Sequence, residues 1–291
     1  MQDILTCAMG LDIHRDVIVA CLAKGELGTD PEIEIRSFST LIPEMRKLRD
    51  WVLEAECRYV AMESTGIYWQ PIYEMLEPCF DGQINILVVN ARHMKNVPGR
   101  KTDMRDAQWI ATLLRAGLLK GSFIPDKTFR ELRHLTRYRK SIVRDITAQK
   151  NRIDKFLQSS GFRFTAFLSD AFGASGRNII RHLMEYGNIS REALDRCLKT
   201  QTRKRIDEIL IALNGSLSEH QRGFLRMIFG HLEALEQHRH TVEGAITKEI
   251  TKHEEALSLL CSIPGIDVTA AAAIIAEIGT DMSAFPDSQH I

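Results

Sequence analysis

The stretch CAMGLDIHRDVIVACL, residues 7–22, decides the fold of this chain. It contains two apolar runs, 7–13 and 16–22, that are joined tightly through His14 and Arg15. Short apolar runs of this length, separated by a polar connection, predict strands rather than helices. We therefore expect the chain to begin with two consecutive, closely connected strands.

The same pattern continues through the first hundred residues. It predicts further strands over 32–38, 59–62 and 84–89, and helices over 42–56 and 68–76. Three strands followed by alternating helix and strand predict a mixed sheet with helices packed on it, which is an α/β fold. We expect this domain to span residues 1–125.

Helical patterns dominate from residue 103 onward. The expected helices cover 103–119, 128–157, 179–186, 191–198 and 202–213, and residues 218–260 form one long helix or a hairpin. The connection over 159–176 mixes Gly, Ser and Phe and is expected to be irregular. Together these patterns predict a basic helical, partly coiled-coil region over 126–256.

The last part of the chain, 257–291, places Pro264 and Gly265 between a helix ending near Ser262 and an alanine-rich helix over 268–278. This is the helix-hairpin-helix pattern, in which backbone N–H groups at a helix start hold a DNA phosphate without reading sequence. A plain packing unit of two helices has the same pattern, so both interpretations stand at this point.

Formal charge is distributed unevenly along the chain. Lys plus Arg and Asp plus Glu are each 38, which excludes a uniformly basic nucleic-acid binder. Residues 101–205, however, carry 23 basic and 10 acidic side chains between two acidic flanks. Such a segment predicts a polyanion-binding surface, although a solvated helix face gives the same counts. The candidate nucleic-acid contacts on its long helix are Arg130, Arg133, Arg137, Arg139, Lys140, Arg144, Lys150 and Arg152.

The sequence shows neither a long apolar run nor a basic stretch followed by an apolar core at its start. We therefore expect no membrane span, no signal peptide and a cytoplasmic protein. The six cysteines are scattered, with no C-x-x-C pair, and are expected to be reduced core residues rather than a disulfide framework or a zinc site.

Four acidic residues are candidates for metal chemistry. Asp12 and Glu63 each end a predicted strand, and Asp103 and Asp106 lie three residues apart, so they share one face of a helix. Four converging carboxylates would repel one another unless divalent cations neutralised them. Two Mg²⁺ ions suit phosphodiester chemistry, so the pattern predicts a magnesium-dependent nuclease-like site.

Each of these assignments has a simpler alternative. Asp12 or Glu63, taken alone, also suits the end of a strand. The Asp103 and Asp106 pair also suits the first turn of a helix capped by Thr102. Lys101 and Arg105 flank Asp103, where they contact the scissile phosphate or pair with nearby acids.

Five stretches together carry a resemblance to a known family: MGLDIHRDVIVA, AMESTGIYWQPIYEML, VVNARHMKNVPGRKTDMRDAQWIATLLRAGLL, RELRHLTRYRKSIVRDITAQKNRI and SIPGIDVTAAAAIIAEIG. In this order, from about residue 8 to residue 287, they resemble the transposases of the insertion sequence one-ten family, relatives of the pilin-gene invertase Piv.

The resemblance implies an N-terminal RuvC-like (ribonuclease H-like) domain with an Asp-Glu-Asp-Asp metal tetrad, here Asp12, Glu63, Asp103 and Asp106. It also implies a homo-oligomeric DNA recombinase of an insertion sequence that binds donor and target DNA and is guided by a structured bridge RNA. Cleavage and transfer of DNA strands would depend on Mg²⁺, with two ions in the site.

In that family a further segment with the proposed nucleophilic serine follows the helix-hairpin-helix. This sequence ends at Ile291, where that segment would begin, so we expect a truncated product or a fragment and assign no serine as nucleophile. Two other interpretations are open. One is a non-catalytic nucleic-acid-binding product; the other is a sugar-kinase or actin-like ATPase, whose phosphate loop expects small residues where His14 and Arg15 stand.

Overall fold

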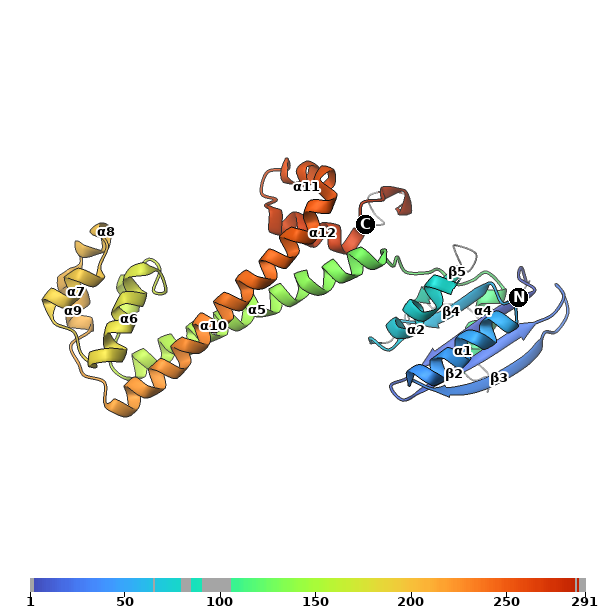
Figure 1. Ribbon diagram of the computed structural model, residues 1–291, viewed down its shortest axis with the longest axis horizontal. Helices are drawn as coiled ribbons and strands as arrows, with labels where there is room; N and C mark the ends of the chain where they lie inside the picture. Colours follow the sequence, from blue (N-terminus) through green and yellow to red (C-terminus); the bar gives the residue numbers. More distant parts are fainter. Residues whose placement is uncertain (1–2, 65, 80–84, 91–105, 286, 288–291) are drawn as a thin grey trace. The chain divides into compact units, whose positions relative to one another are not determined.

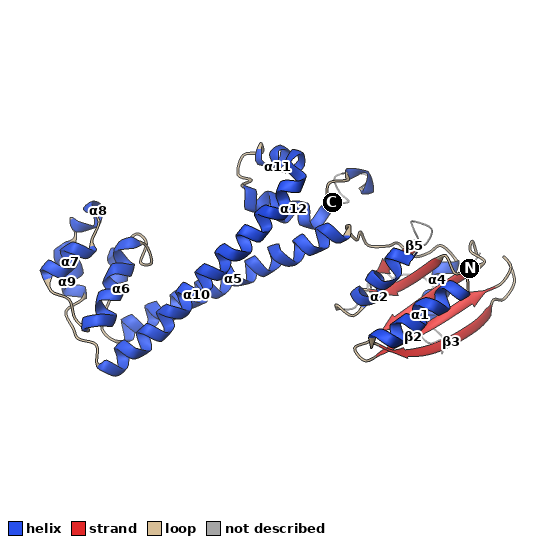
Figure 2. Cartoon of the chain, viewed as in Figure 1, coloured by secondary structure: helices blue, strands red, loops and turns tan. Residues whose placement is uncertain are grey.

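A computed structural model describes residues 3–64, 66–79, 85–90, 106–285 and 287 of the chain. The chain forms two compact units, Met1–Ile124 and Pro125–Ile291 (Figure 1). Within the described residues, all strands lie in the first unit and the second unit is helical (Figure 2). The α/β class predicted for the first part of the chain is therefore confirmed.

The first unit is built on a five-stranded mixed sheet with the order β3-β2-β1-β4-β5. Strands β1, β2 and β3 pair antiparallel, whereas β4 and β5 run parallel to β1. The strand bounds are Cys7–Ile13, Val17–Lys24, Glu32–Ser39, Tyr59–Glu63 and Asn85–Val89. All five predicted strands are present, and their described ends differ from the predicted ends by two residues or fewer.

Helices α1 (Ile42–Glu54) and α2 (Trp69–Leu76) cover one face of this sheet. Alternate residues of β1, namely Met9, Leu11 and Ile13, point into the apolar core that these helices form with the sheet. The predicted helix over 42–56 ends two residues earlier, because Glu56 has a φ of 52°, which is incompatible with continuing the helix. A short 3-10 turn, Glu77–Cys79, follows α2.

Helix α4 (Asp106–Arg115) covers the other face, where most side chains of the sheet are small. A Cβ atom on Gly10 would lie 2.2 Å from the carbonyl oxygen of Ala107 and 2.4 Å from the backbone nitrogen of Ala111. The helix backbone therefore rests directly on strand β1, and only glycine leaves room for it at residue 10.

The second unit is organised by two long helices, α5 (Lys127–Ser159) and α10 (Glu219–Ile250), which pack side by side in opposite directions (Figure 1). The remaining helices are α6 (Ala174–Tyr186), α7 (Arg191–Cys197), α8 (Thr200–Arg203), α9 (Ile206–Ala212), α11 (Glu254–Cys261) and α12 (Val268–Ile278). Short 3-10 turns lie at Phe164–Phe167, Thr251–His253 and Met282–Ala284. One continuous apolar core joins both long helices, the small helices and α12.

Three predicted elements of this unit differ in the structure. The helix expected over 202–213 is broken into α8 and α9, because the backbone of Arg205 leaves the helical region. The break lets Ile209 enter the core while the Arg205 guanidinium lies 5.1 Å from the ring centre of Phe167. Helix α6 begins at Ala174 rather than 179, and the 3-10 turn at Phe164–Phe167 interrupts the stretch expected to be irregular.

The segment expected over 218–260 as one long helix or a hairpin is a long helix that ends at Ile250 and is followed by separate short elements. It begins at Glu219 because Ser218 and Gln221 form a reciprocal capping box. Among the described residues, no helix has both the length and the apolar character needed to cross a bilayer.

Candidate functional site

Two of the predicted acids end neighbouring parallel strands on the face covered by α4. Asp12 follows Gly10 by two residues in β1, so the pleat directs it to the same face as Gly10. Glu63 likewise follows Ala61 by two residues in β4, so it points to the face of the sheet that α4 covers. Leu11 is opposite Met62 in the parallel pairing of β1 and β4. The next residues, Asp12 and Glu63, therefore lie side by side at the carboxyl ends of the two strands.

Helix α4 brings a third predicted acid toward the same end of the sheet. Its residues Ile110 and Leu114 pack with Ala8, earlier in β1, while the backbone of Ala107 lies over Gly10. The first residue of the helix, Asp106, therefore lies toward the Asp12 end of the strand, and its charge acts on Asp12. The fourth predicted acid, Asp103, lies outside the described residues, as do Lys101 and Arg105.

Burial raises the pKa of Asp12, and the charges of Asp106 and Glu63 raise it further. The ring of His14 opposes this shift, because its Nε2 atom lies 3.1 Å from Oδ2 of Asp12. Asp12 keeps only 16% of its side-chain surface exposed, whereas His14 keeps 61%. The site therefore holds a half-enclosed carboxylate among like charges.

This electrostatic arrangement predicts a pH-dependent effect of Asp12→Asn on stability. A carboxyl group whose pKa is raised by folding stabilises the folded state at low pH and loses that contribution as the pH rises through the folded-state pKa. Without metal at about pH 7 we therefore expect Asp12→Asn to melt at a higher temperature than the unmodified chain, and the difference to shrink toward about pH 4. Thermal melts across this pH range in EDTA measure the effect; an asparagine variant that is less stable at neutral pH contradicts it.

The donor set is chemically suited to a hard divalent cation, because carboxylate oxygens are the ligands that Mg²⁺ prefers. Within the described ranges, no three His, Cys, Asp or Glu side chains lie close enough together to hold an ion. The charges of Asp106 and Glu63 nevertheless both act on Asp12, and the binding of a cation would relieve this repulsion.

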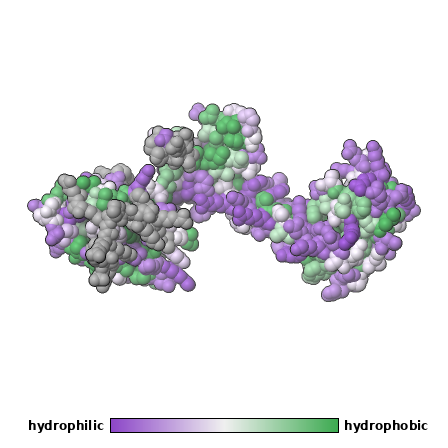
Figure 3. Space-filling model, turned by 180° about the vertical axis from the view of Figure 1, so that it is seen from behind, coloured by the Kyte–Doolittle hydropathy of each residue, from purple (hydrophilic) through white to green (hydrophobic). Residues whose placement is uncertain are grey.

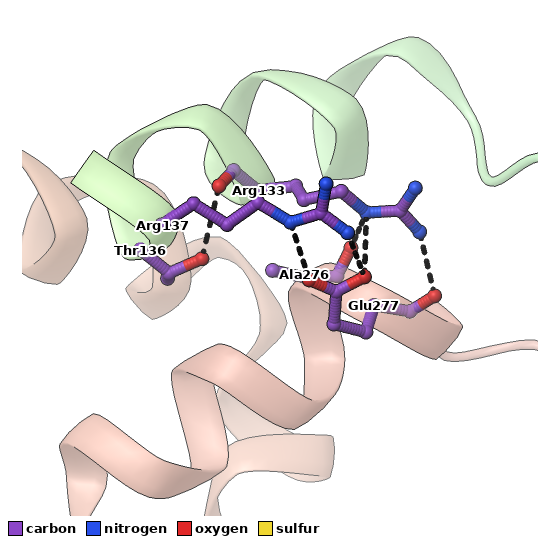
Figure 4. A network of polar contacts seen from close by, with 5 residues as sticks. All are labelled: Arg133, Thr136, Arg137, Ala276 and Glu277. Atoms are coloured by element: carbon purple, nitrogen blue, oxygen red, sulfur yellow. Dashed lines mark hydrogen bonds and ion pairs between the residues drawn. The ribbon is translucent and has the colours of Figure 1, made fainter. Parts of the chain in front are cut away.

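Two of the predicted nucleic-acid contacts hold α12 against α5 (Figure 4). Arg137 donates from Nε and Nη2 to the two carboxylate oxygens of Glu277, each at 2.9 Å. Arg133 donates to the backbone oxygens of Ala276 and Glu277 at 3.2 and 2.7 Å and forms an ion pair of 3.0 Å with the Glu277 carboxylate. These arginines therefore bind the last turn of α12, where cations are favoured.

The other candidates on α5 divide into internal and exposed groups. Arg130 is buried and donates to the Pro125 oxygen at 2.9 Å, and Arg139 donates to Glu243 at 2.8 Å. The remaining contacts are those of Arg152 with Gln149 and of the Lys150 ammonium with the ring of Phe172, 5.6 Å from its centre. Lys140 and Arg144 are exposed. Arg137 and Arg152 are exposed as well, although they contact Glu277 and Gln149. Nucleic-acid binding by the eight residues stays a prediction.

Removing the charge of Glu277 should loosen the junction between α5 and α12. We expect Glu277→Gln to lower the free energy of unfolding of the second unit by about 1–2 kcal/mol, because a bidentate, partly exposed ion pair is lost while the backbone contacts of Arg133 remain. Denaturant unfolding followed by circular dichroism measures the change. Glu131→Gln, an exposed glutamate in α5, is the matched control and should leave stability within about 0.5 kcal/mol; equal losses in both variants would contradict the prediction.

Pro264 and Gly265 lie in the exposed turn between α11 and α12. Gly265 has a φ of 92°, which glycine adopts without strain, and Asp267 caps α12 by accepting a hydrogen bond of 2.7 Å from the Ala270 backbone nitrogen. Both predicted helices are present, with α12 at the predicted bounds. Hydrophobic surface is gathered over α11 and α12, where Leu259 is 72% exposed (Figure 3).

The sequence patterns do not predict the contacts of two residues, His14 and Arg115. His14 was interpreted only as part of a turn, although its position two residues after Asp12 predicts that both side chains leave the strand on one side. Arg115 is 1% exposed and binds the carbonyl oxygens of Leu5, Gly25 and Glu26, which are distant in sequence. No local sequence pattern predicts such a buried arginine.

Comparison with known families agrees with this architecture. A family model for DEDD-type IS110 transposases, described as "Transposase", matches residues 9–161, which is more than half of the chain. A second model, described as "Transposase IS116/IS110/IS902 family", matches residues 257–291. A search of curated proteins found no match. The chain, with its strand-end carboxylates in the first matched region and the α11–α12 turn in the second, belongs to the IS110 family of transposases, which act in DNA transposition and recombination.

Proposed function

We propose that this transposase cleaves and transfers DNA strands with Mg²⁺ held by Asp12, Glu63, Asp103 and Asp106. The observation that carries the proposal is the position of Asp12 beside Glu63 at the carboxyl ends of β1 and β4, within the electrostatic reach of Asp106. Bound Mg²⁺ ions would supply activation of an attacking oxygen and stabilisation of the leaving oxygen. Family membership supports DNA as the substrate.

The protein's own residues have distinct tasks in this proposal. The close packing of α4 on Gly10 keeps Asp106 within electrostatic reach of Asp12 before any cation binds. The contact between His14 and Asp12 limits rotation of that carboxylate and offsets part of the repulsion that it experiences. His14 is thus a positioning residue in the proposed site.

We further propose that the partners are donor DNA, target DNA and a structured guide RNA, with the chain acting as a homo-oligomer. The resemblance set out above supports the guide RNA and the assembly. The exposed Lys140 and Arg144, together with the Pro264–Gly265 turn, are the described features best placed to meet a nucleic-acid backbone. Binding through them would be salt-dependent and largely independent of sequence.

The first experiment tests the metal site by calorimetry with Mg²⁺ on the full chain, Asp12→Asn and Asp106→Asn. We expect measurable binding to the unmodified chain and at least a tenfold loss in both variants, because each removes a charged oxygen ligand. Asp16→Asn is the matched control: its carboxylate lies in the same hairpin, is 87% exposed and should not affect binding. Unchanged Mg²⁺ binding in all three variants would overturn the metal proposal.

A nucleic-acid shift assay on the same samples separates the catalytic proposal from the non-catalytic binder. If the acids hold metal, Asp12→Asn should lose strand cleavage and keep nucleic-acid binding, whereas Lys140→Gln combined with Arg144→Gln should weaken binding and reduce its salt dependence. If Asp12→Asn keeps strand cleavage and the Lys140 and Arg144 double variant keeps nucleic-acid binding, a role without chemistry at this site is favoured. Membership of a transposase family decides against the sugar-kinase or actin-like ATPase interpretation.

A further inference from the structure

We propose that Cys7 and Cys57 form a reactive dithiol site, which a hydroperoxide oxidises to a disulfide between the start of β1 and the segment that leads into β4. This site lies at the end of β1 opposite to Asp12 and is separate from the carboxylates. Neither the family match nor the proposed transposition chemistry assigns a role to these cysteines.

The sheet brings the two thiols together. Cys7 is the first residue of β1, and Cys57 comes two residues before β4, which pairs parallel to β1 with Met9 opposite Val60. Cys57 belongs to the apolar core beneath α1 and α2, Cys7 packs against the same core, and the two thiols interact there. The Cys57 Sγ donates to the Tyr59 carbonyl oxygen at 3.3 Å. Neither cysteine is part of a disulfide in the described structure.

The two thiols differ in access and in charge environment. Cys57 is completely buried, whereas Cys7 is partly exposed. The hydrogen bond from Cys57, together with the nearby cations of Lys24 and Arg115, lowers the pKa of Cys7 even though burial opposes this. The hydrogen bond to Cys7 and burial raise the pKa of Cys57. One partly exposed thiol with a lowered pKa beside one buried thiol with a raised pKa is the arrangement of an attacking and a resolving cysteine.

The reaction consumes one molecule of hydrogen peroxide. The Cys7 thiolate attacks one peroxide oxygen, the O–O bond breaks, and the leaving hydroxide takes up the proton released from Cys7 to form water. The sulfur of Cys57 then attacks the Cys7 sulfenic acid, the S–O bond breaks, and the Cys57 proton leaves with the hydroxyl group as a second water. Two thiols are oxidised by two electrons, and the peroxide is reduced to two waters.

Other cysteines of the chain provide internal comparisons. Burial raises the pKa of Cys21 to about 11, and the same cause raises the pKa of Cys197. A buried thiol with a raised pKa is a poor nucleophile at neutral pH. Cys7 should therefore react before Cys21 and Cys197 in the folded, unmodified protein.

The test treats the full chain with hydrogen peroxide, blocks the remaining thiols by alkylation and maps the cysteines by mass spectrometry. We expect a peptide pair linked through Cys7 and Cys57, its reversal by dithiothreitol, and a rise in melting temperature on oxidation, because the crosslink closes a long loop of the unfolded chain. In Cys57→Ser the Cys7 sulfenic acid should persist and be captured by dimedone. Cys79→Ser, which changes a partly buried cysteine elsewhere in the first unit, should still form the crosslink.

The rate of alkylation of the unmodified chain gives a second measurement that needs no variant to fold. At neutral pH we expect iodoacetamide to modify Cys7 at least about tenfold faster than Cys197. Equal rates at the two cysteines, or a peroxide-dependent crosslink that involves other cysteines while Cys7 and Cys57 stay reduced, would overturn the proposal. Neither measurement depends on metal binding or DNA cleavage, so its outcome is independent of the proposed transposition site.

Discussion

Replacing Gly10 by alanine is expected to destabilise the first unit by about 3 kcal/mol or more. The added Cβ atom would lie 2.2 Å from the Ala107 carbonyl oxygen and 2.4 Å from the Ala111 backbone nitrogen. Both atoms belong to the backbone of α4, so no side-chain rotation relieves the clash, and the whole helix has to move away from β1. Thermal or denaturant unfolding of the variant measures the loss.

The same substitution is expected to weaken the proposed metal site even in molecules that stay folded. Movement of α4 away from the sheet carries Asp106 away from Asp12, and Mg²⁺ affinity should fall with it. Gly230→Ala is the control, because a Cβ at that position of α10 meets nothing within 4 Å; we expect it to be neutral or to stabilise its helix by up to about 1 kcal/mol. A Gly10→Ala chain with unchanged melting would show that the close approach of α4 is absent in solution.

Arg115→Leu is the second substitution with a large expected effect. The arginine is 1% exposed and donates to the backbone oxygens of Leu5, Gly25 and Glu26 at 3.0, 3.2 and 2.8 Å. Its Nη1 atom also lies 3.5 Å from the Asp3 carboxylate. Leucine fills part of the volume but leaves these acceptors without their donor, so we expect a loss of about 3–5 kcal/mol in the first unit.

Arg115→Lys distinguishes the hydrogen-bond geometry from the charge. Lysine keeps the positive charge, but its single ammonium group cannot reach acceptors spread around the planar guanidinium. We therefore expect an intermediate loss, between those of the leucine variant and the exposed control Arg46→Leu, which should stay within about 0.5 kcal/mol. Equal stability of the lysine variant and the unmodified chain would mean that only the charge matters here.

Much of the first unit was predictable because its strands alternate between two faces that bury different kinds of side chain. In β1 the residues Met9 and Leu11 enter one core, while Gly10 and Asp12 face α4. This period of two is visible in the sequence and identifies Asp12 as a carboxylate at the end of a strand. The break between α8 and α9 was not predictable, because it depends on where Ile209 meets the core and not on a glycine or proline.

The basic residues of α5 show the limit of arguments from composition. Their number predicts a polyanion-binding surface, yet Arg133 and Arg137 lie against Glu277, which is more than a hundred residues away in sequence. The count of arginines is local information, whereas the position of their partners depends on the path of the chain between α5 and α12. Charge counts therefore indicate a candidate segment, and the packing decides which of its side chains face solvent.

The sequence by itself determined the α/β class, nearly all strand and helix positions of the first unit, and the strand-end locations of Asp12 and Glu63, because hydrophobic periodicity is a local property. Only the tertiary structure decided that α4 rests on Gly10 and carries Asp106 toward Asp12, that Arg115 binds both the segment before β1 and the loop after β2, and that Cys7 meets Cys57. These contacts join residues between 50 and 110 positions apart. They form only when burial of the shared core compensates for the entropy of closing such long loops, which no local pattern encodes.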